Sequence, residues 1–523
     1  MRLPSFFSMT LTRAAALAAL VSMAAAGPCT AAAADAASAQ ILTPKPGPAP
    51  KINGPAVYGV RPGHDFIYRI PATGERPMKF SAKGLPKPLQ LDAATGIITG
   101  KTPAKRGEYA VELSASNKHG QSTRRFKLVV GDTLALTPPM GWNDWYTHYA
   151  RVTDKLMRQA ADTMIASGMA DYGYQYVNID DCWMTKPGSP IDELAGAPRD
   201  AAGAILPNRR FPDMPGLAAY IHSRGLKAGL YTSPGPKTCA QFTGTLNHEE
   251  VDARTFAAWG FDFLKYDWCS YGQVVKAKTV AEFRAPYDLM GGILQKLDRD
   301  VFFNLCQYGM GDVWNWGGDA GGHSWRTTGD LGLEKSSKLP GFYSIGFKNA
   351  QHAGIVRPGR WNDPDYILIG SVGDAFNIDA PAKRTTLTPD EQYSYMSMWS
   401  LMASPLFFSG DMGALDEFTL NVLCNAEVID VDQDALGKQG RIIRKSEDEF
   451  ILAKPLEDGS LAVGLFNLSE SPRKIEVSWR DLGLSAKQRV RDVWRQKDLG
   501  SAEGSYGADT PRHGVTFVRL FGK

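Results

Sequence analysis

Apolar and polar residues alternate in two parts of the chain, one toward each end. Such alternation is typical of a β-strand with one buried and one solvated face, because successive side chains point to opposite sides. Toward the N-terminus the pattern covers residues 109–115 and 126–130, with a turn expected at 117–120. Toward the C-terminus, short apolar runs at 461–465 and 515–518 have the same strand-like character. We therefore predict a small β-sandwich in each of these regions.

Strands and helices alternate through the long middle part of the chain. Short apolar runs predict strands at 176–179, 226–232, 262–266, 301–305 and 366–369. The apolar residues from Leu156 to Ile165 share one helical face, and Asn247 with Glu250 forms a capping-box pattern. The second of these helices is expected to end at Gly260. Repeated strand–helix units predict a parallel sheet and, at this span, a (β/α)8 TIM barrel; a doubly wound sheet is the alternative, although no G-x-G-x-x-G motif opens a helix.

The expected fold class is multidomain α/β plus β, a central barrel flanked by two β-sandwiches. The parts are a signal peptide at 1–34, an N-terminal β-sandwich at 48–132, the barrel at 136–438 and a C-terminal antiparallel β-sandwich at 439–523. The signal peptide is inferred from Arg2, Arg13 and the apolar run 14–26, which is too short to span a bilayer permanently. A retained N-terminal anchor is the alternative. We expect a secreted or periplasmic protein with no stable membrane insertion.

Charge and cysteine usage narrow the classes of function. A net charge of +3 over 523 residues gives no sign of a nucleic-acid surface, so no nucleic-acid partner is expected. None of the eight histidines forms an H-x-H or H-E-x-x-H motif, and the six cysteines lack the spacing of a zinc site. We expect no metal. The sequence leaves the oligomeric state open.

Polar residues collect where the predicted strands end, which is where the active site of a barrel enzyme lies. They are Asp180, Asp181, Tyr231, Lys265, Asp267, Cys306, Gln307, Arg326, Asp330 and Asp365. Lys265 and Asp267 are two apart on a strand, so their side chains point the same way, and the ammonium would favour the ionised carboxylate that a nucleophile needs. A plain ion pair is the structural alternative. Asp330 would instead have to hold a proton, which the nearby Arg326 opposes.

Two carboxylates are the minimum for splitting a glycosidic bond, one to attack the sugar and one to protonate the leaving oxygen. Over residues 136–523 the chain resembles glycoside hydrolase family twenty-seven, whose best-known members are α-galactosidases. The resemblance rests on TPPMGWNDW at 137–145, NIDDCW at 178–183, KTC at 237–239, KYD at 265–267, WRTTGD at 325–330, WNDPD at 361–365 and QDALGKQG at 433–440. Separately, residues 89–100 resemble the immunoglobulin-like (Ig-like) domains of secreted bacterial glycosidases, which implies a stabilising cap or spacer, or else a binding module.

The resemblance implies a retaining exo-α-galactosidase that removes terminal α-D-galactosyl residues by double displacement and requires no cofactor. Asp267 would be the nucleophile and Asp330 the acid/base. The implied substrate contacts are Trp145, Asp180, Asp181, Tyr231, Lys265, Cys306, Gln307, Arg326 and Asp365. Cys239 and Cys269 match the family's disulfide beside the site.

One departure from the family pattern bears on the sugar. Many members have Cys-Glu-Trp after the fifth strand, where this chain has Cys306-Gln307-Tyr308, a segment that faces the sugar 2-position. The bulk of Gln307 and Tyr308 disfavours an α-N-acetylgalactosaminidase, and the short side chains of Asp180 and Asp181 disfavour a β-L-arabinopyranosidase, which carries a longer acid there. The alternatives to an α-galactosidase are these two activities, an α-glucan hydrolase, and a non-catalytic carbohydrate-binding protein. The two intact catalytic carboxylates argue against a non-catalytic protein.

Overall fold

Three regions of secondary structure follow one another in a computed structural model that describes residues 41–333, 338–375 and 377–522. The first region is all β, the second alternates strands and helices, and the third is β with one short helix. The described residues from Leu42 onward belong to one compact unit. The expected signal peptide at 1–34 lies outside the described residues.

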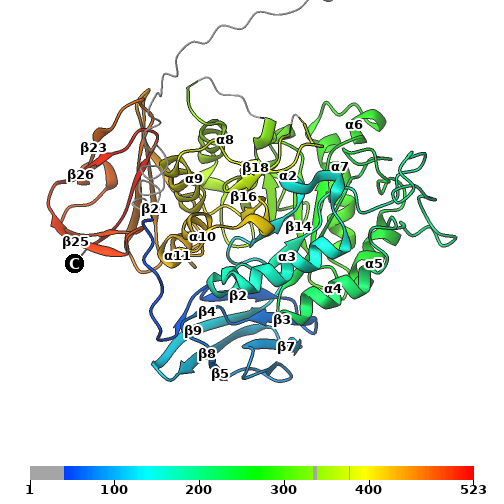
Figure 1. Ribbon diagram of the computed structural model, residues 1–523, viewed down its shortest axis with the longest axis horizontal. Coiled ribbons are helices and arrows are strands. Elements are labelled where there is room, and N and C mark those ends of the chain that lie inside the picture. The colour runs from blue at the N-terminus through cyan, green and yellow to red at the C-terminus, as the bar shows by residue number, and fades with distance from the viewer. Residues whose placement is uncertain (1–40, 334–337, 376, 523) are drawn as a thin grey trace, which may run out of the picture. The chain divides into compact units, whose positions relative to one another are not determined.

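The central region is built on a sheet of eight parallel strands (Figure 1). They are β10 (Met140–Asn143), β11 (Tyr176–Asn178), β12 (Lys227–Thr232), β13 (Phe263–Asp267), β14 (Phe302–Cys306), β15 (Ser324–Arg326), β16 (Trp361–Asp363) and β19 (Leu406–Phe408). Each strand from β10 to β15 pairs with the next along the chain, ending with β16, and β10 also pairs with β19. This order never reverses direction across the sheet, which confirms the TIM-like barrel over the doubly wound alternative.

The strand expected at 366–369 is wrong, and β16 and β19 are the last two strands instead. Pro364 has no amide hydrogen to donate, and Asp365 has a φ of 84°, so the extended backbone of β16 does not continue. Ile367 forms only an isolated parallel bridge with Phe408 of β19. That bridge joins the segment just after β16 to β19, so the two ends of the sheet approach each other.

Helices surround this sheet, with α3, α4 and α5 on one side of the strands in Figure 1 and α8 to α11 on another. Their bounds are α2 (Trp145–His148), α3 (Asp154–Ala166), α4 (Met214–Ser223), α5 (Glu249–Trp259), α6 (Tyr271–Val274), α7 (Val280–Leu294), α8 (Gly341–Ala350), α9 (Pro389–Leu401), α10 (Glu417–Leu423) and α11 (Ala426–Asp432). Short 3-10 helices are η1 (Tyr149–Arg151), η2 (Met169–Tyr172), η3 (Met310–Asn315), η4 (Leu331–Leu333), η5 (Ala353–Ile355) and η6 (Met412–Ala414). A two-stranded ribbon of β17 (Ser371–Val372) and β18 (Lys383–Arg384) lies in the loop after β16.

The capping box expected at Asn247 is wrong, although the end of that helix is confirmed. Asn247 has a φ of 63°, in the left-handed region, whereas a capping residue has an extended backbone. The residue before the first turn of α5 is His248, which makes no side-chain capping bond. Gly260 ends α5 with a φ of 98°, a conformation that favours glycine.

The N-terminal region consists of small sheets that enclose their own core. One sheet has the order β2-β9-β8-β5 and another β3-β7-β6, with β1 paired to β4. The strands are β1 (Lys51–Ile52), β2 (Val57–Val60), β3 (Asp65–Arg69), β4 (Ala72–Thr73), β5 (Lys79–Lys83), β6 (Gln90–Leu91), β7 (Ile97–Lys101), β8 (Gly107–Asn117) and β9 (Gly120–Val130). The predicted hairpin is confirmed, because β8 and β9 pair antiparallel around a turn at 117–120. Its alternating apolar residues are buried, among them Leu113, Phe126 and Leu128.

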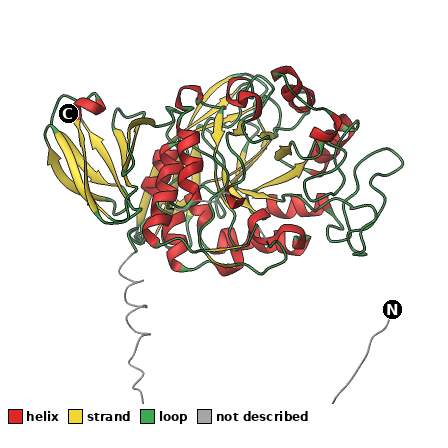
Figure 2. Ribbon diagram, turned by 90° about the horizontal axis from the view of Figure 1, so that it is seen from above, coloured by secondary structure: helices red, strands yellow, loops and turns green. Residues whose placement is uncertain are grey.

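The C-terminal region is an antiparallel β-structure (Figure 2). A six-stranded sheet has the order β20-β21-β22-β27-β24-β25, and β23 pairs with β26. The strands are β20 (Arg441–Lys445), β21 (Glu449–Pro455), β22 (Leu461–Asn467), β23 (Arg473–Ser478), β24 (Gln488–Asp492), β25 (Lys497–Ala502), β26 (Ser505–Thr510) and β27 (Val515–Phe521), with α12 (Trp479–Leu482) after β23. The strands predicted at 461–465 and 515–518 are confirmed within β22 and β27.

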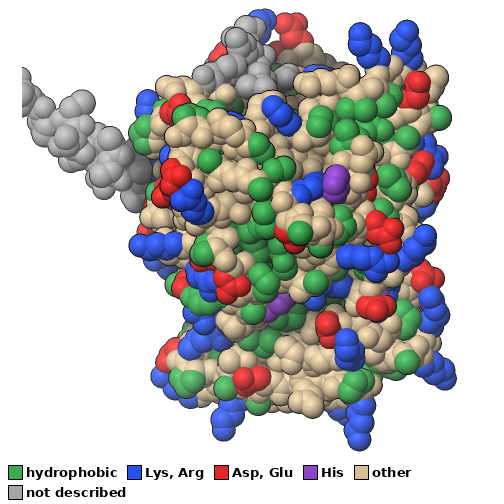
Figure 3. All heavy atoms as spheres, turned by 90° about the vertical axis from the view of Figure 1, so that its right-hand side faces the viewer, with side chains coloured by type: hydrophobic (Ala, Val, Ile, Leu, Met, Phe, Trp, Pro, Cys, Tyr) green, Lys and Arg blue, Asp and Glu red, His purple; other side chains and the backbone are tan. Residues whose placement is uncertain are grey.

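On the face drawn in Figure 3, basic and acidic side chains are interspersed. This face therefore carries no continuous basic surface of the kind that binds a phosphate backbone. In the part of the chain that the structure describes, no helix is both long and apolar enough to cross a membrane.

Candidate active site

The polar residues predicted at the strand ends come together at the carboxyl edge of the barrel. Asp267, Cys306 and Arg326 are the last residues of β13, β14 and β15. Tyr231 is the penultimate residue of β12, and Asp180 follows β11 by two residues. All five are buried. Parallel strands with carboxyl ends at one edge account for this convergence.

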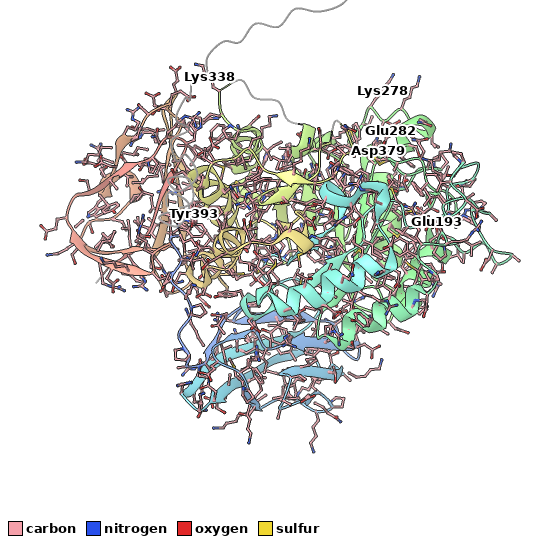
Figure 4. The ribbon with its side chains drawn as sticks, viewed as in Figure 1. Glu193, Lys278, Glu282, Lys338, Asp379 and Tyr393 are labelled. Carbon is pink, nitrogen blue, oxygen red and sulfur yellow. A yellow bond between two sulfur atoms is a disulfide. The ribbon has the colours of Figure 1, made fainter. Side chains whose placement is uncertain are left out.

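The loops around this edge carry charged side chains. Figure 4 labels Lys278 and Glu282, which follow β13, and Asp379, which follows β16, in the upper right of the view. Glu193 belongs to the loop after β11 and lies lower, on the right-hand side.

Two tyrosine hydroxyls hold the carboxylate of Asp267. Tyr308 donates to Oδ1 at 2.6 Å, and Tyr231 donates to Oδ2 at 3.2 Å. Burial raises the pKa of Asp267 to about 6, while Lys265 and the hydrogen bond from Tyr308 act in the opposite direction. The carboxylate is therefore ionised at neutral pH and becomes protonated only slightly below it.

Lys265 forms its ion pair with Asp180. Its Nζ lies 2.8 Å from Asp180 Oδ2, which also accepts hydrogen bonds from Asn143 at 2.9 Å and Tyr366 at 3.2 Å. The expectation that the Lys265 ammonium favours the ionised form of Asp267 agrees with the direction of its effect. Its charge does lower the pKa of Asp267, but burial of the carboxyl is the larger effect, because a buried carboxylate loses its hydration.

Asp181 is oriented by the main chain. Its Oδ1 accepts the Cys182 amide at 2.7 Å, and its Oδ2 accepts the Ala240 amide at 2.9 Å. Burial raises the pKa of Asp181 to about 7, against the effect of these hydrogen bonds. Asp180 also accepts a backbone amide, that of Asp181 at 2.9 Å on Oδ1, so the two adjacent acids differ mainly in the ion pair with Lys265, which only Asp180 makes.

Arg326 joins Asp330 to Asp365. Its Nη2 lies 3.2 Å from Asp330 Oδ1 and 3.1 Å from Asp365 Oδ2. Asp365 also accepts hydrogen bonds from the Tyr146 hydroxyl and the Leu331 amide, both at 2.8 Å. The side chain of Asp330 is 34% exposed, whereas that of Asp365 is 1% exposed. Asp365 is therefore a buried anchor for Arg326, and Asp330 is the acid that a ligand can reach.

Cys239 and Cys269 form a disulfide, as the resemblance implied. Cys269 Sγ lies 3.2 Å from the Tyr231 hydroxyl, and Cys239 Sγ lies 3.8 Å from the Tyr308 hydroxyl. The disulfide thus contacts both of the tyrosines that bind Asp267.

Three other predicted residues have distinct surroundings. Trp145 is half-buried at the start of α2. Cys306 is a buried free thiol, with Arg326 Nη1 3.8 Å from its sulfur. Gln307 is buried and donates from Nε2 to the Met310 carbonyl at 2.9 Å, but its Oε1 has no hydrogen-bond partner among the described residues. That oxygen is free to accept a hydrogen bond from a ligand.

Sequence reasoning missed four residues of this network. Asn143 and Tyr366 donate to Asp180, and Tyr146 donates to Asp365. The fourth is Tyr308, whose bulk the sequence indicated but whose hydrogen bond to Asp267 it did not. Asn143 lies inside the motif at 137–145, and Tyr366 directly follows Asp365. Position relative to the strand ends could therefore have found these two residues.

One group of potential metal ligands lies here among the described residues: Cys239, Asp267 and Cys269. Both sulfurs are in the disulfide, and a cysteine binds metal through its thiolate. This group does not fit a metal ion. The expectation of a metal-free protein stays a prediction.

The chain matches known sequence families over most of its length. The family described as "Alpha galactosidase A" matches residues 137–434, and the "Alpha galactosidase C-terminal beta sandwich domain" matches residues 448–520. The "Putative Ig domain" family matches residues 49–131. All the site residues described above lie within the first match.

Individual proteins agree with these matches. An α-galactosidase from Cyamopsis tetragonoloba is 37% identical over 423 residues, which are 80% of this chain and 93% of that protein. A Bacteroides fragilis structure, described as a "putative alpha-galactosidase/melibiase", has a TM-score of 0.83 at 34% identity and covers 92% of this chain and 100% of its own. The structure of an α-galactosidase from Saccharomyces cerevisiae with raffinose has a TM-score of 0.63 at 25% identity, over 74% of this chain and 98% of its own.

Proposed function

Since the chain belongs to the α-galactosidases of glycoside hydrolase family twenty-seven, we propose that Asp267 and Asp330 carry out its retaining, exo-acting hydrolysis of terminal α-D-galactosides. The observation that carries this proposal is the contrast between the two acids. Asp267 is buried and held by two tyrosines, whereas Asp330 is partly exposed beside Arg326. This contrast supports the proposal that Asp267 is a fixed nucleophile and Asp330 the proton donor.

The reaction has two displacements. In the first, a carboxylate oxygen of Asp267 forms a bond to the anomeric carbon while the bond to the leaving oxygen breaks, and Asp330 gives its proton to that oxygen. In the second, Asp330 takes a proton from water as the water oxygen displaces Asp267 from the anomeric carbon. Two inversions retain the configuration of the sugar, and the enzyme returns to its starting protonation.

The surrounding polar groups fit a galactose ring. Asp180, Asp181 and Lys265 would bind the 4-, 6- and 3-hydroxyls. Trp145 and Tyr231 would form the pocket wall. The free Oε1 of Gln307, together with Arg326, Cys306 and Asp365, would lie on the side of the 2-hydroxyl. The unpartnered amide oxygen supports this placement, because a buried acceptor left unpaired is costly and a sugar hydroxyl would satisfy it.

Oligosaccharides with a terminal α-galactosyl group are the substrates we propose. Raffinose, which is bound in the Saccharomyces cerevisiae relative, is such a sugar. Two short acids, Asp180 and Asp181, leave room for the 6-hydroxymethyl group and thereby favour galactose over L-arabinopyranose.

We further propose that residues 1–34 direct export and are then removed. The support is the sequence alone, with Arg2 and Arg13 near the apolar run 14–26. N-terminal sequencing of the protein recovered from a culture tests this. A mature N-terminus close to Asp35 is expected, and a chain that still begins at Met1 would contradict it.

A panel of p-nitrophenyl glycosides tests the proposed function. The α-D-galactoside should be hydrolysed in clear preference to the β-L-arabinopyranoside, the α-N-acetylgalactosaminide and the α-glucoside. Asp267→Asn should lose at least about 10³-fold in kcat. Asp330→Asn should lose about 10²- to 10⁴-fold on substrates with a poor leaving group, and less on p-nitrophenyl substrates, whose leaving group needs little protonation.

Asp288→Asn is the matched control, because this acid is 44% exposed on α7 and should leave the activity unchanged. Parent-like activity of Asp267→Asn would contradict the mechanism. Activity on another glycoside alone would contradict the sugar assignment while leaving the two carboxylates in their roles.

A further inference from the structure

Tyr308 occupies a position where many family members have tryptophan, and its hydroxyl reaches the carboxylate that we assign as nucleophile. The contact is short, 2.6 Å from the Tyr308 oxygen to Asp267 Oδ1. The other oxygen of Asp267 has the longer contact, 3.2 Å to Tyr231. Tyr308 therefore makes the closer of the two side-chain hydrogen bonds that fix this carboxylate.

The backbone holds Tyr308 in an unusual conformation. Its φ is 67°, and that of the following Gly309 is 88°, so two consecutive residues are in the left-handed region. A side chain at Gly309 would bring a Cβ to within 2.5 Å of the Thr327 carbonyl oxygen. The turn is thus packed tightly against the end of β15. A strained backbone at a functional site persists where the surrounding structure imposes it, and here it aims the ring at Asp267.

Tyr308 also lies next to the groups around the second acid. The Arg326 guanidinium carbon is 5.9 Å from the centre of the Tyr308 ring, and Arg326 Nη2 is 3.2 Å from Asp330. The ring therefore has the nucleophile at its hydroxyl end and the arginine of the acid/base over its face. Burial and the neighbouring Asp267 carboxylate raise the pKa of Tyr308, so the hydroxyl keeps its proton and acts as a donor.

We propose that Tyr308 is a positioning residue that fixes Asp267 Oδ1 and stabilises the ionised form of the nucleophile. This inference rests on the proposed role of Asp267. A hydrogen bond donated to a carboxylate favours the charged form, and a bond to a charged group is stronger than one between neutral groups. Loss of the hydroxyl should therefore make Asp267 easier to protonate and leave it less well oriented for attack.

The test is the pH dependence of kcat/KM for Tyr308→Phe on p-nitrophenyl α-D-galactopyranoside. In the parent, activity should fall on the acidic side near pH 6 as Asp267 takes up a proton. In Tyr308→Phe this acidic limb should move to higher pH by about one unit. The ratio of parent to variant kcat/KM should therefore be about tenfold larger at pH 5 than at pH 7.5. Tyr308→Trp also lacks the hydroxyl and should shift the limb in the same direction.

Tyr343→Phe is the matched control. Tyr343 is a buried tyrosine of α8 whose hydroxyl donates at 2.8 Å to the carbonyl of His513 in the C-terminal region, and its loss should leave the limb in place. Circular dichroism spectra and melting curves show that each variant is folded. A folded Tyr308→Phe with an unmoved limb overturns the inference.

Asp267→Asn distinguishes failure of the proposed function from failure of the role proposed for Tyr308. If that variant keeps the parent's activity, the proposed function itself fails. If it is inactive while Tyr308→Phe and Tyr308→Trp both keep the parent's acidic limb, only the role of Tyr308 fails.

Discussion

At the scale of single residues, burial has the largest effect on the chemistry of this site. Spacing along the chain could predict that Lys265 and Asp267 share one side of β13, and they do. It could not predict that Lys265 pairs with Asp180 from the loop after β11, since that contact depends on how the ends of β11 and β13 are arranged in the barrel. Nor could it predict the hydroxyl of Tyr308, which reaches Asp267 from a left-handed turn.

Removal of the Asp267 charge should stabilise the folded protein at neutral pH. The folded pKa of about 6 lies above the ordinary value of 3.8, so the folded state binds this proton more tightly than the unfolded state does. The free energy of unfolding therefore falls as pH rises from 3.8 to 6, by up to about 3 kcal/mol in total. Asp267→Asn avoids that loss.

Melting curves check this prediction. Asp267→Asn should melt above the parent at pH 8, and the difference should shrink as pH falls through 6 toward 4. Asp288→Asn, at an exposed position, should show no such trend. An Asp267→Asn effect of equal size at both ends of the pH range would contradict the assigned pKa.

At the scale of elements, periodicity predicted strands and helices well where one face is buried. It failed at 366–369, where an apolar run follows Pro364 and the left-handed Asp365 and remains outside the sheet apart from the Ile367 bridge. It also failed at Asn247, because a capping-box pattern gives no information on the backbone angle that a cap requires. Both errors concern local backbone conformation, whereas the sequence pattern reports burial.

The disulfide between Cys239 and Cys269 connects two loops that follow neighbouring strands, β12 and β13. With a sequence separation of 30 residues, the chain-entropy estimate of its contribution is about 3 to 4 kcal/mol. Cys239→Ser should therefore lower the melting temperature under oxidising conditions. Cys424→Ser, at a buried free thiol at the end of α10, is the control for loss of a sulfur. Unchanged melting of Cys239→Ser would count against the bridge.

At the scale of the whole molecule, the N-terminal sandwich contacts the barrel at the edge opposite the candidate active site. Arg61 Nε lies 2.7 Å from Asp300, which comes two residues before β14 begins. The Tyr58 hydroxyl donates at 3.2 Å to Gln175, the residue before β11. These are the amino ends of the barrel strands. The contacts support the interpretation of this domain as a stabilising cap.

The sequence could predict this multidomain order and the barrel class, because each part has its own hydrophobic period. It could not predict which surfaces of the parts meet. Arg61, Asp300 and Gln175 belong to no periodic pattern, and their partners become visible only when the chain is folded.

The most direct test of the central claim is to identify the residue that attacks the sugar. A fluorinated α-galactosyl fluoride, chosen so that its covalent intermediate hydrolyses slowly, is incubated with the mature enzyme, which is then digested and examined by mass spectrometry. One galactosyl label is expected on the peptide that contains Asp267, and the Asp267→Asn variant should carry no label. A label on Asp330 or on any other residue would contradict the central claim.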